Sequence, residues 1–278
     1  MSPPDLFSRS ARAARRGRRS HTPAYLEDQL NLSLLERLDS VQRKFERVLL
    51  IGANAALVEA LRARGLNVRV TDPSPQRALT LGGEAHDEDR PWSDAPAFDL
   101  ILAGGTLDTV ADLPGALILA RRALVPDGLF LAAMFGHPSL PALRAAAHQA
   151  DEAEGHSAGR FHPLIDARSA GDLLVRAGFA LPVADAETIT LSYRDVTALV
   201  ADLRAAAATN VLAARYPVTR RWVQTLAHAF AANGNGGRTI ERLTIIAMTG
   251  WAPADTQPRP AARGSGLSLT RVLPSGGQ

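Results

Sequence analysis

Apolar residues recur along this chain in two patterns. Between residues 23 and 43, Leu26, Leu30, Leu34, Leu35 and Leu38 repeat at helical spacing and give one apolar face. Elsewhere apolar residues form short continuous runs at 48–51, 98–105 and 129–136, and "NVRVTD" (67–72) alternates with period two. These runs predict four strands, with the first ending at a glycine and the second at an aspartate.

Helical segments separate the predicted strands. "EALRARGL" (59–66) ends at a glycine, and "DLPGALILARRALVPDG" (112–128) ends in a Pro-Asp-Gly turn. Strands that alternate with helices of this length favour an α/β domain whose parallel sheet is covered on both faces.

The pattern changes after residue 135. Ala- and Leu-rich helical segments fill 139–177 and 195–232, with strands predicted at 188–193 and within 239–251. We therefore divide the chain into a basic arm (1–22), a domain (23–252) with a helical cap made from 139–177 and 195–232, and a tail (253–278). The tail is rich in Pro, Gly and Ser, and we expect it to be disordered.

Composition narrows the class of protein. The 278 residues are 46% hydrophobic and 21% charged, and they contain no cysteine. Disulfides, thiolate metal sites and a cysteine nucleophile are therefore excluded. No apolar run approaches the roughly 20 residues needed to cross a bilayer. We expect a soluble protein without a membrane span, in a reducing compartment, and assign it to the cytoplasm.

The net charge of +3 conceals a basic N-terminus. Six arginines, at positions 9, 12, 15, 16, 18 and 19, stand in the first 20 residues against the single acid Asp5. The interpretation favoured here is an amphipathic helix that docks on the protein or on an acidic partner. A disordered arm and a segment that binds nucleic acid or a membrane are the alternatives, with nucleic acid the less expected partner.

The stretch "VLLIGANAAL" (48–57) reads as a strand, a glycine turn and a helix. Gly52 allows close approach of backbone to a ligand, and Asn54 is the best non-glycine residue for a left-handed conformation. The dinucleotide pattern G-x-G-x-x-G is not met, which argues against NAD and FAD, and the phosphate loop of NTPases is absent.

Three further residues are candidates for binding the same ligand, at the edge of the predicted sheet where its strands end. Asp72 ends the second strand 20 positions after Gly52, where a carboxylate can accept the ribose hydroxyls of an adenosine. In "HDEDRPW" (86–92), Asp87 could meet an adenine amino group, whereas Glu88 and Asp89 are interpreted as solvated loop residues. Gly104 leaves space over the ligand-binding edge of the sheet.

Together these segments resemble the class I S-adenosylmethionine-dependent methyltransferases. The resemblance is to the branch of the mitochondrial complex I assembly factor 5, which resembles an arginine hydroxylase, and of the malonyl-acyl-carrier-protein O-methyltransferase. It rests on "RSARAARRGRRS", "LLERLDSVQRKFERVLLIG", "FDLILAGGTLDTVADLPGALILARRALVPDGLFLAAMFG", "DLLVRAGFALPVADAETITLSYRDVTALVADLR" and "MTGWAP". It implies a Rossmann-like sheet with an N-terminal helical extension and a helical cap.

The resemblance also implies a cofactor, S-adenosylmethionine, with Gly52, Asn54, Asp72, Asp87 and Gly104 on its side. Where the family has an acidic residue and two further glycines, this chain has Leu50, Asn54 and Ala56, so its cofactor loop is degenerate. Asp108 and Thr109, just after the strand predicted at 98–105, replace the His-Trp that is typical of the family after its fourth strand.

The function implied is methyl transfer to a protein or acyl-carrier substrate. The alternatives are an assembly factor for a respiratory complex I subunit, resembling an arginine hydroxylase, and a pseudo-methyltransferase that only binds a partner. Methyl transfer needs little beyond alignment, so no catalytic residue is identified. Tyr193 and Arg194 are the candidates on the substrate side, and packing under the helices is the competing interpretation of Tyr193.

His137, His156 and His162 follow the strand predicted at 129–136. They lack the paired spacing and the supporting carboxylate of a metal site, so no metal is expected.

Overall fold

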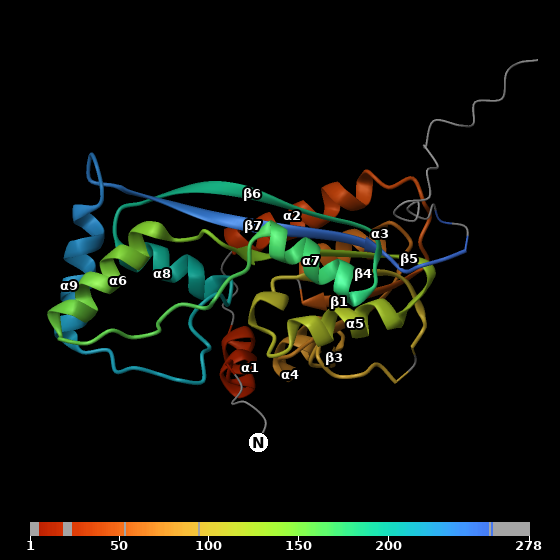
Figure 1. Cartoon of the computed structure of the whole chain (residues 1–278), viewed down its shortest axis with the longest axis horizontal. Helices are drawn as coiled ribbons and strands as arrows, with labels where there is room; N and C mark the ends of the chain where they lie inside the picture. Colours follow the sequence, from red (N-terminus) through yellow and green to blue (C-terminus); the bar gives the residue numbers. More distant parts are fainter. Residues whose placement is uncertain (1–5, 19–23, 53, 94, 256, 258–278) are drawn as a thin grey trace, which may run out of the picture.

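The computed structural model describes residues 6–18, 24–52, 54–93, 95–255 and 257, and its centre is a mixed seven-stranded sheet (Figure 1). The strand order is β3-β2-β1-β4-β5-β7-β6. The strands are β1 (Arg47–Gly52), β2 (Asn67–Asp72), β3 (Glu84–Ala85), β4 (Phe98–Gly104), β5 (Leu124–Gly136), β6 (Ala180–Tyr193) and β7 (Thr239–Trp251). Strands β1 to β5 pair in parallel, and β7 runs antiparallel to both β5 and β6.

Both faces of the central strands β1, β4 and β5 are buried, as their continuous apolar runs predict. In β1, Val48 and Leu50 belong to one core cluster, while Leu49 and Ile51 belong to the other. Helices α2 (Tyr25–Asp39) and α3 (Ala55–Ala63) supply leucines to the first cluster, and α5 (Leu113–Ala123) and α7 (Ala167–Ala177) pack in the second. The α/β fold class predicted from the alternation is confirmed.

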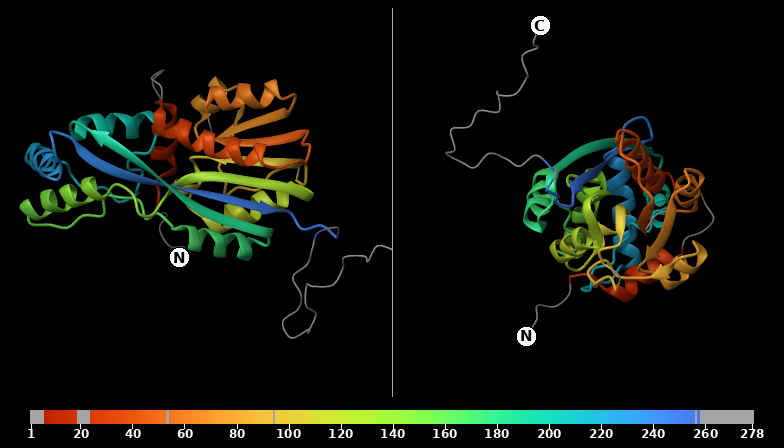
Figure 2. Two further views of the ribbon diagram at one scale, coloured as in Figure 1. Left: turned by 90° about the horizontal axis from the view of Figure 1, so that it is seen from above. Right: turned by 90° about the vertical axis from the view of Figure 1, so that its right-hand side faces the viewer.

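A cap of three helices lies at one end of the sheet, where the long antiparallel strands β6 and β7 extend beyond the other strands (Figure 2). The cap helices are α6 (Pro141–Ala153), α8 (Val196–Ala205) and α9 (Arg220–Ala232). The buried Glu241 of β7 fixes α6, because its carboxylate accepts hydrogen bonds from the backbone N–H groups of Ala142 (3.3 Å) and Leu143 (2.6 Å). Helix α7, which we had assigned to the cap, packs instead beside α5 and β6.

The basic N-terminus forms a docked helix, α1 (Arg9–Gly17), between the cap and the α/β body (Figure 1). The Ser8 hydroxyl caps it by accepting from the N–H of Ala11, and basic residues in its last turn complement the helix dipole. Phe7 anchors its start in a small cluster with Val211 and Leu212. Residues 1–5 and 19–23 lie outside the described part of the chain.

Several predicted boundaries differ from those observed. Helix α5 ends at Ala123, and the expected Pro-Asp-Gly turn is a bulge inside β5, where Asp127 has φ +62°. Residues 206–219 are not helical. Strand β6 begins eight residues earlier than predicted, because an edge strand with few buried side chains carries little apolar signal. Of the predicted tail, 256 and 258–278 lie outside the described residues.

Within the described residues, no helix combines the length and the apolar character that crossing a bilayer requires.

Candidate functional site at the carboxyl edge of the sheet

The carboxyl ends of β1, β2 and β4 meet at the Gly52 turn, the position at which open α/β sheets bind their ligands, and we call this position the crevice. Gly52 has φ +72°, a conformation that side chains disfavour. A Cβ atom there would lie 2.5 Å from the carbonyl oxygen of Gly104 and 2.5 Å from Cγ2 of Thr106. Glycine is therefore required at this position, which pairs with Gly104 of β4 in the sheet register.

Asn54 serves as a helix cap and not as a left-handed glycine substitute. Its backbone is extended (φ −120°, ψ 173°), so the conformation we expected is wrong. Its side-chain oxygen accepts from the N–H of Leu57 (3.0 Å), and its amide nitrogen donates to Asp28 (2.8 Å). Leu50 is fully buried in the core. Neither of these departures from the family pattern blocks the crevice.

Asp72 lies at the centre of the crevice and is completely buried. One carboxylate oxygen accepts from the backbone N–H of Ser74 (2.8 Å), and Arg16 of α1 donates to both oxygens, at 2.7 Å from Nη2 and at 3.0 and 3.1 Å from Nε. Burial disfavours the charge of Arg16, but the Asp72 carboxylate more than offsets it and holds the pKa of Arg16 above its ordinary value.

Arg16 also spans the crevice to the β4 side. Its Nη1 donates to the carbonyl oxygen of Gly105 (2.8 Å), and its Nη2 lies 3.1 Å from where a Cβ of Gly52 would be. One guanidinium therefore contacts the three features that we assigned to a cofactor: the glycine turn, the carboxylate after β2 and the glycines after β4.

A second buried pair closes the far side of the crevice. Arg12 donates to both oxygens of Glu88 (2.8 and 2.7 Å), and also to the carbonyl oxygen of Thr106. Glu88 is 2% exposed, so its interpretation as a solvated residue is wrong. The Asp89 side chain is also buried, in a pair with Arg9 (2.5 Å), so its interpretation as a solvated residue is wrong as well. Asp87 is half-buried, 3.2 Å from Arg9. Its proximity to Arg9 attaches Asp87 to the same network.

The helix presents these arginines as one stripe. Arg9, Arg12 and Arg16 follow the i, i+3, i+7 spacing that places side chains on one helix face. Arg15 lies on a different face and contacts the cap region. Sequence reasoning identified the basic arm but missed this stripe, although the spacing was visible; its partners were not, because they are 56 to 80 residues away along the chain.

Asp108 is a site residue that sequence reasoning did not single out as a ligand. It lies in the short 3-10 helix η1 (Leu107–Thr109) after β4, and its Oδ1 is buried without a hydrogen-bond partner in the described part of the chain. Burial raises the pKa of Asp108 to about 6, although the nearby Arg12 guanidinium lowers it. A carboxyl group of this kind can exchange a proton near neutral pH.

The two residues predicted on the substrate side lie apart from the crevice. Tyr193 is buried in the core, where its hydroxyl donates to Asp202 (2.9 Å), and burial followed by that carboxylate raises its pKa. Arg194 is exposed and pairs with Asp195 (3.0 Å). Their role with a substrate stays a prediction.

The three histidines do not converge. His162 is packed against Phe7 and accepts a hydrogen bond from the N–H of Val211 (3.0 Å), and burial, reinforced by Arg144, lowers its pKa to about 4. Among the residues that the structure describes, no group of three or more His, Asp or Glu side chains is arranged to hold a metal ion.

Comparison with known proteins agrees with this architecture. Residues 19–182 match a family described as a methyltransferase domain. The chain is 29% identical over 259 residues to a zebrafish (Danio rerio) protein named arginine-hydroxylase NDUFAF5, mitochondrial, covering 87% of this chain and 79% of that protein. It is 31% identical over 256 residues to the malonyl-[acyl-carrier protein] O-methyltransferase of Xylella fastidiosa, covering 84% and 83% of the two chains.

A solved structure shows the same fold. The YcgJ protein of Bacillus superimposes with a TM-score of 0.57 at 13% identity, covering 80% of this chain and 99% of that one. Taken together, the strand order, the glycine turn with its buried aspartate, and these matches show that the chain belongs to the class I S-adenosylmethionine-dependent methyltransferase family, on the branch that contains the arginine hydroxylase and the malonyl-acyl-carrier-protein O-methyltransferase.

Proposed function

We propose that this protein is an S-adenosylmethionine-dependent methyltransferase whose cofactor competes with helix α1 for one crevice. The observation that supports this most strongly is the buried Asp72 carboxylate beside the Gly52 turn. A carboxylate at the end of the second strand of such a sheet is placed to accept the hydroxyls of a ribose.

The carboxylates and glycines of the crevice suit the cofactor, but helix α1 in its docked position occupies them. Asp72 would hold the ribose, Asp87 or Glu88 would face the adenine, and Gly52 and Gly104 would let the backbone approach. Both oxygens of Asp72 and both of Glu88 are already bonded to arginines, however. We therefore expect cofactor binding to require withdrawal of α1, which releases these carboxylates.

Withdrawal of α1 costs less than the number of its ion pairs suggests. Removing one partner of a buried pair leaves an uncompensated charge, but separating both partners lets water solvate each of them. The apolar anchoring of α1 is small, since the cluster at its start contains Phe7, Val211 and Leu212. A ligand that binds only the open state shifts the equilibrium by its differential affinity.

When bound, the cofactor supplies an electrophilic methyl group on its sulfonium. The chain itself has to position the acceptor and exclude water. Asp108 stands next to the crevice with a pKa of about 6, so it is the described residue best suited to take a proton from an acceptor near neutral pH. We propose a protein or a carrier-bound acyl group as the acceptor class, in keeping with the named relatives.

The occupied crevice also favours a second candidate function. A chain in which arginines permanently fill the cofactor site would act as a pseudo-methyltransferase that only binds a partner protein. That partner would be a respiratory complex I subunit if the resemblance to the assembly factor extends to function. The name of the zebrafish relative states arginine hydroxylation, and that activity is the alternative to binding alone.

Calorimetric titration with S-adenosylhomocysteine separates the two candidates. The methyltransferase proposal predicts binding to the full chain that is at least tenfold weaker in Asp72→Asn. The matched control is Asp39→Asn, because Asp39 is an exposed aspartate that pairs with Arg64 away from the crevice. Absence of binding at millimolar ligand, with the fold intact by circular dichroism, would contradict the methyltransferase proposal and support the binding-only function.

A further inference from the structure

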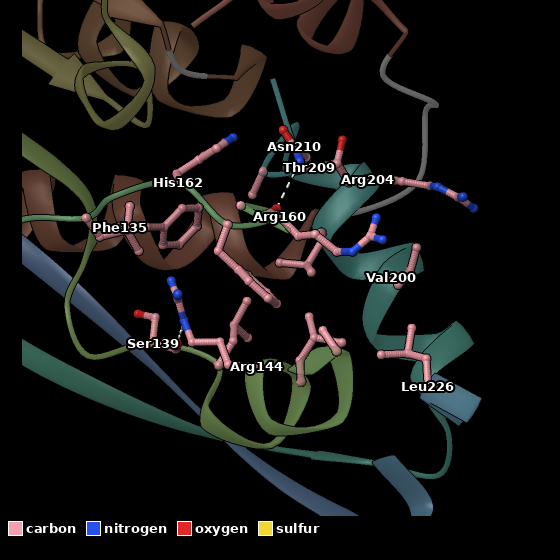
Figure 3. Close-up of a pocket in the computed structure, with 18 of the residues that line it drawn as sticks. Phe135, Ser139, Arg144, Arg160, His162, Val200, Arg204, Thr209, Asn210 and Leu226 are labelled. Carbon is pink, nitrogen blue, oxygen red and sulfur yellow. Dashed lines mark hydrogen bonds between the residues drawn. The ribbon is translucent and has the colours of Figure 1, made fainter. Parts of the chain in front are cut away.

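A cavity lies under the cap, apart from the Asp72 crevice. It has a volume of about 440 Å³ and opens between α6, α8, α9 and the segment 159–164 (Figure 3). Its walls are mainly apolar, from Phe135, Leu143, Val200, Leu203, Leu226 and Leu243. The size falls within the range of about 300–1,000 Å³ typical of sites for small molecules.

The apolar lining continues to the surface at one place. Tyr216 and Val218, in the non-helical segment between α8 and α9, line the cavity and are 43% and 59% exposed. Exposed apolar side chains beside a cavity are typical of a ligand entrance.

The charged residues of the lining are strongly unbalanced. Arg15, Arg144, Arg160, Arg204 and Arg215 line the cavity, and the one carboxyl group among the lining residues is that of Asp108. Of the five arginines, Arg160 is neutralised, because it pairs with Asp151 (2.7 Å) and stacks on Trp222 (4.3 Å).

The remaining arginines form no ion pair with a carboxylate within the described residues, although the carboxylate of Glu241 acts on Arg144 electrostatically. Arg144 donates to the carbonyl oxygen of Ser139 (2.8 Å) and stacks over Phe161 (4.5 Å), both neutral groups. No ion pair forms at Arg15, Arg204 or Arg215 in the described part of the chain. In Figure 3, Arg144 and Arg204 project from α6 and α8, on different sides of the cavity.

These cations act on one another electrostatically. Burial lowers the pKa of Arg15, and the positive charges of Arg18, Arg215 and Arg204 lower it further. Burial also lowers the pKa of Arg144. Like charges gathered beside an apolar cavity are unfavourable unless an anion neutralises them, and guanidinium groups are suited to carboxylate and phosphate oxygens.

We propose that the cap cavity binds an amphipathic anion, with an apolar chain between α6, α8 and α9 and a carboxylate or phosphate among Arg15, Arg204 and Arg215. The site is separate from the Asp72 crevice but adjoins it. Arg15 belongs to the same helix as Arg12 and Arg16, and Asp108 lines the cavity while lying close to Arg12. That this anion is the methyl acceptor rests on the proposed function; that it binds does not.

Direct binding measurements on the full chain, without any cofactor, test the site. Octanoate and octyl phosphate are the amphipathic probes, octanol provides the chain alone, and acetate and inorganic phosphate provide the head groups alone. We expect each amphipathic anion to bind at least tenfold more tightly than octanol and than its own head group. The ratio between octanoate and octyl phosphate shows which head group the arginines prefer.

Variants locate the binding. We expect the double change Arg204→Gln with Arg215→Gln to weaken both amphipathic anions at least tenfold without changing octanol binding. Its matched control is Arg62→Gln with Arg168→Gln, since these are exposed arginines on α3 and α7, away from the cavity. Val200→Phe, at a half-buried cavity position, should weaken all the octyl probes but leave the fold intact by circular dichroism.

Two results would overturn the inference. One is binding of octanoate and octyl phosphate that is no tighter than that of octanol. The other is equal affinity in the Arg204/Arg215 variant and its control. Because no cofactor takes part, a chain that fails to bind S-adenosylhomocysteine can still give the expected result, so the two proposals fail independently.

Discussion

Two groups of arginines on this molecule differ in whether a carboxylate of the same chain pairs with them. At the crevice, Arg12 and Arg16 are buried and bonded to Glu88 and Asp72. At the cap cavity, Arg204 and Arg215 are exposed and meet no carboxylate among the described residues. Arginine side chains therefore close the crevice, where carboxylates pair with them, and remain available to an external anion at the cap cavity. The difference lies in whether the fold supplies the negative charge.

Helix α1 connects the two regions. One face carries the arginines that close the crevice, and Arg15 on another face reaches the cavity. An anion bound at Arg15 and withdrawal of Arg16 would both act on the same nine-residue helix. The comparison between the regions is therefore also a statement about what holds α1 in place.

The largest effect expected is on stability. Arg16→Met leaves the Asp72 carboxylate buried without its main partner, which should lower the free energy of unfolding by about 3–5 kcal/mol. The equivalent change at the cavity, Arg204→Met, removes an exposed and unpaired charge and should change it by less than about 0.5 kcal/mol. Urea unfolding measures both. Equal effects would show that the two groups of arginines do not differ as described.

Asp108, which adjoins both regions, should give a smaller effect that depends on pH. Its pKa in the folded chain is about 6, above the ordinary 3.8, so the folded state binds more protons between these values. The free energy of unfolding therefore falls as pH rises from about 4 to 6 because of this group. Asp108→Asn should remove that contribution and stabilise the chain at pH 7 by about 3 kcal/mol relative to the wild type.

The difference between Asp108→Asn and the wild type has to be followed from pH 4 to 7, because His162 acts in the opposite direction. Its pKa is lowered to about 4, so His162 favours unfolding as pH falls below about 6.5. Both chains share this effect, and it cancels in the difference. A difference that stays constant across the range would show that Asp108 is not the group that titrates.

The smallest effect is expected at Tyr193, which lies in the core and does not line the cavity. Tyr193→Phe removes the hydrogen bond to Asp202 and should cost about 1 kcal/mol in urea unfolding. The affinities for S-adenosylhomocysteine and octanoate should not change. A severalfold loss of either would instead support the substrate-side role predicted for Tyr193.

Local pattern was sufficient to predict much of the fold. The alternation at 67–72 and the apolar runs at 48–51 and 98–105 predicted β2, β1 and β4 nearly to their ends. Gly52 and Asp72 were also accessible from the sequence, because the glycine turn and the strand-end carboxylate follow from strand positions. These predictions depend on contacts within a few residues or on period two, which a single sequence displays.

What the sequence concealed depends on contacts between distant segments. Glu88 reads as a loop carboxylate until Arg12, 76 residues earlier, buries it. Asn54 is a residue type that often adopts a left-handed conformation. Here it is the N-cap of α3, because its side chain accepts a hydrogen bond from Leu57 and donates one to Asp28. The edge strand β6 has few buried positions, so its apolar pattern predicted only the second part of the strand.

The most direct test of the account is the affinity of S-adenosylhomocysteine for Arg16→Gln against the wild type. Arg15→Gln is the control, since Arg15 neighbours Arg16 but does not contact Asp72. If the α1 arginines close the crevice, Arg16→Gln should bind at least tenfold more tightly than the wild type, with Arg15→Gln within about twofold of it. An affinity in Arg16→Gln equal to or weaker than that of the wild type would contradict the closure of the crevice by α1.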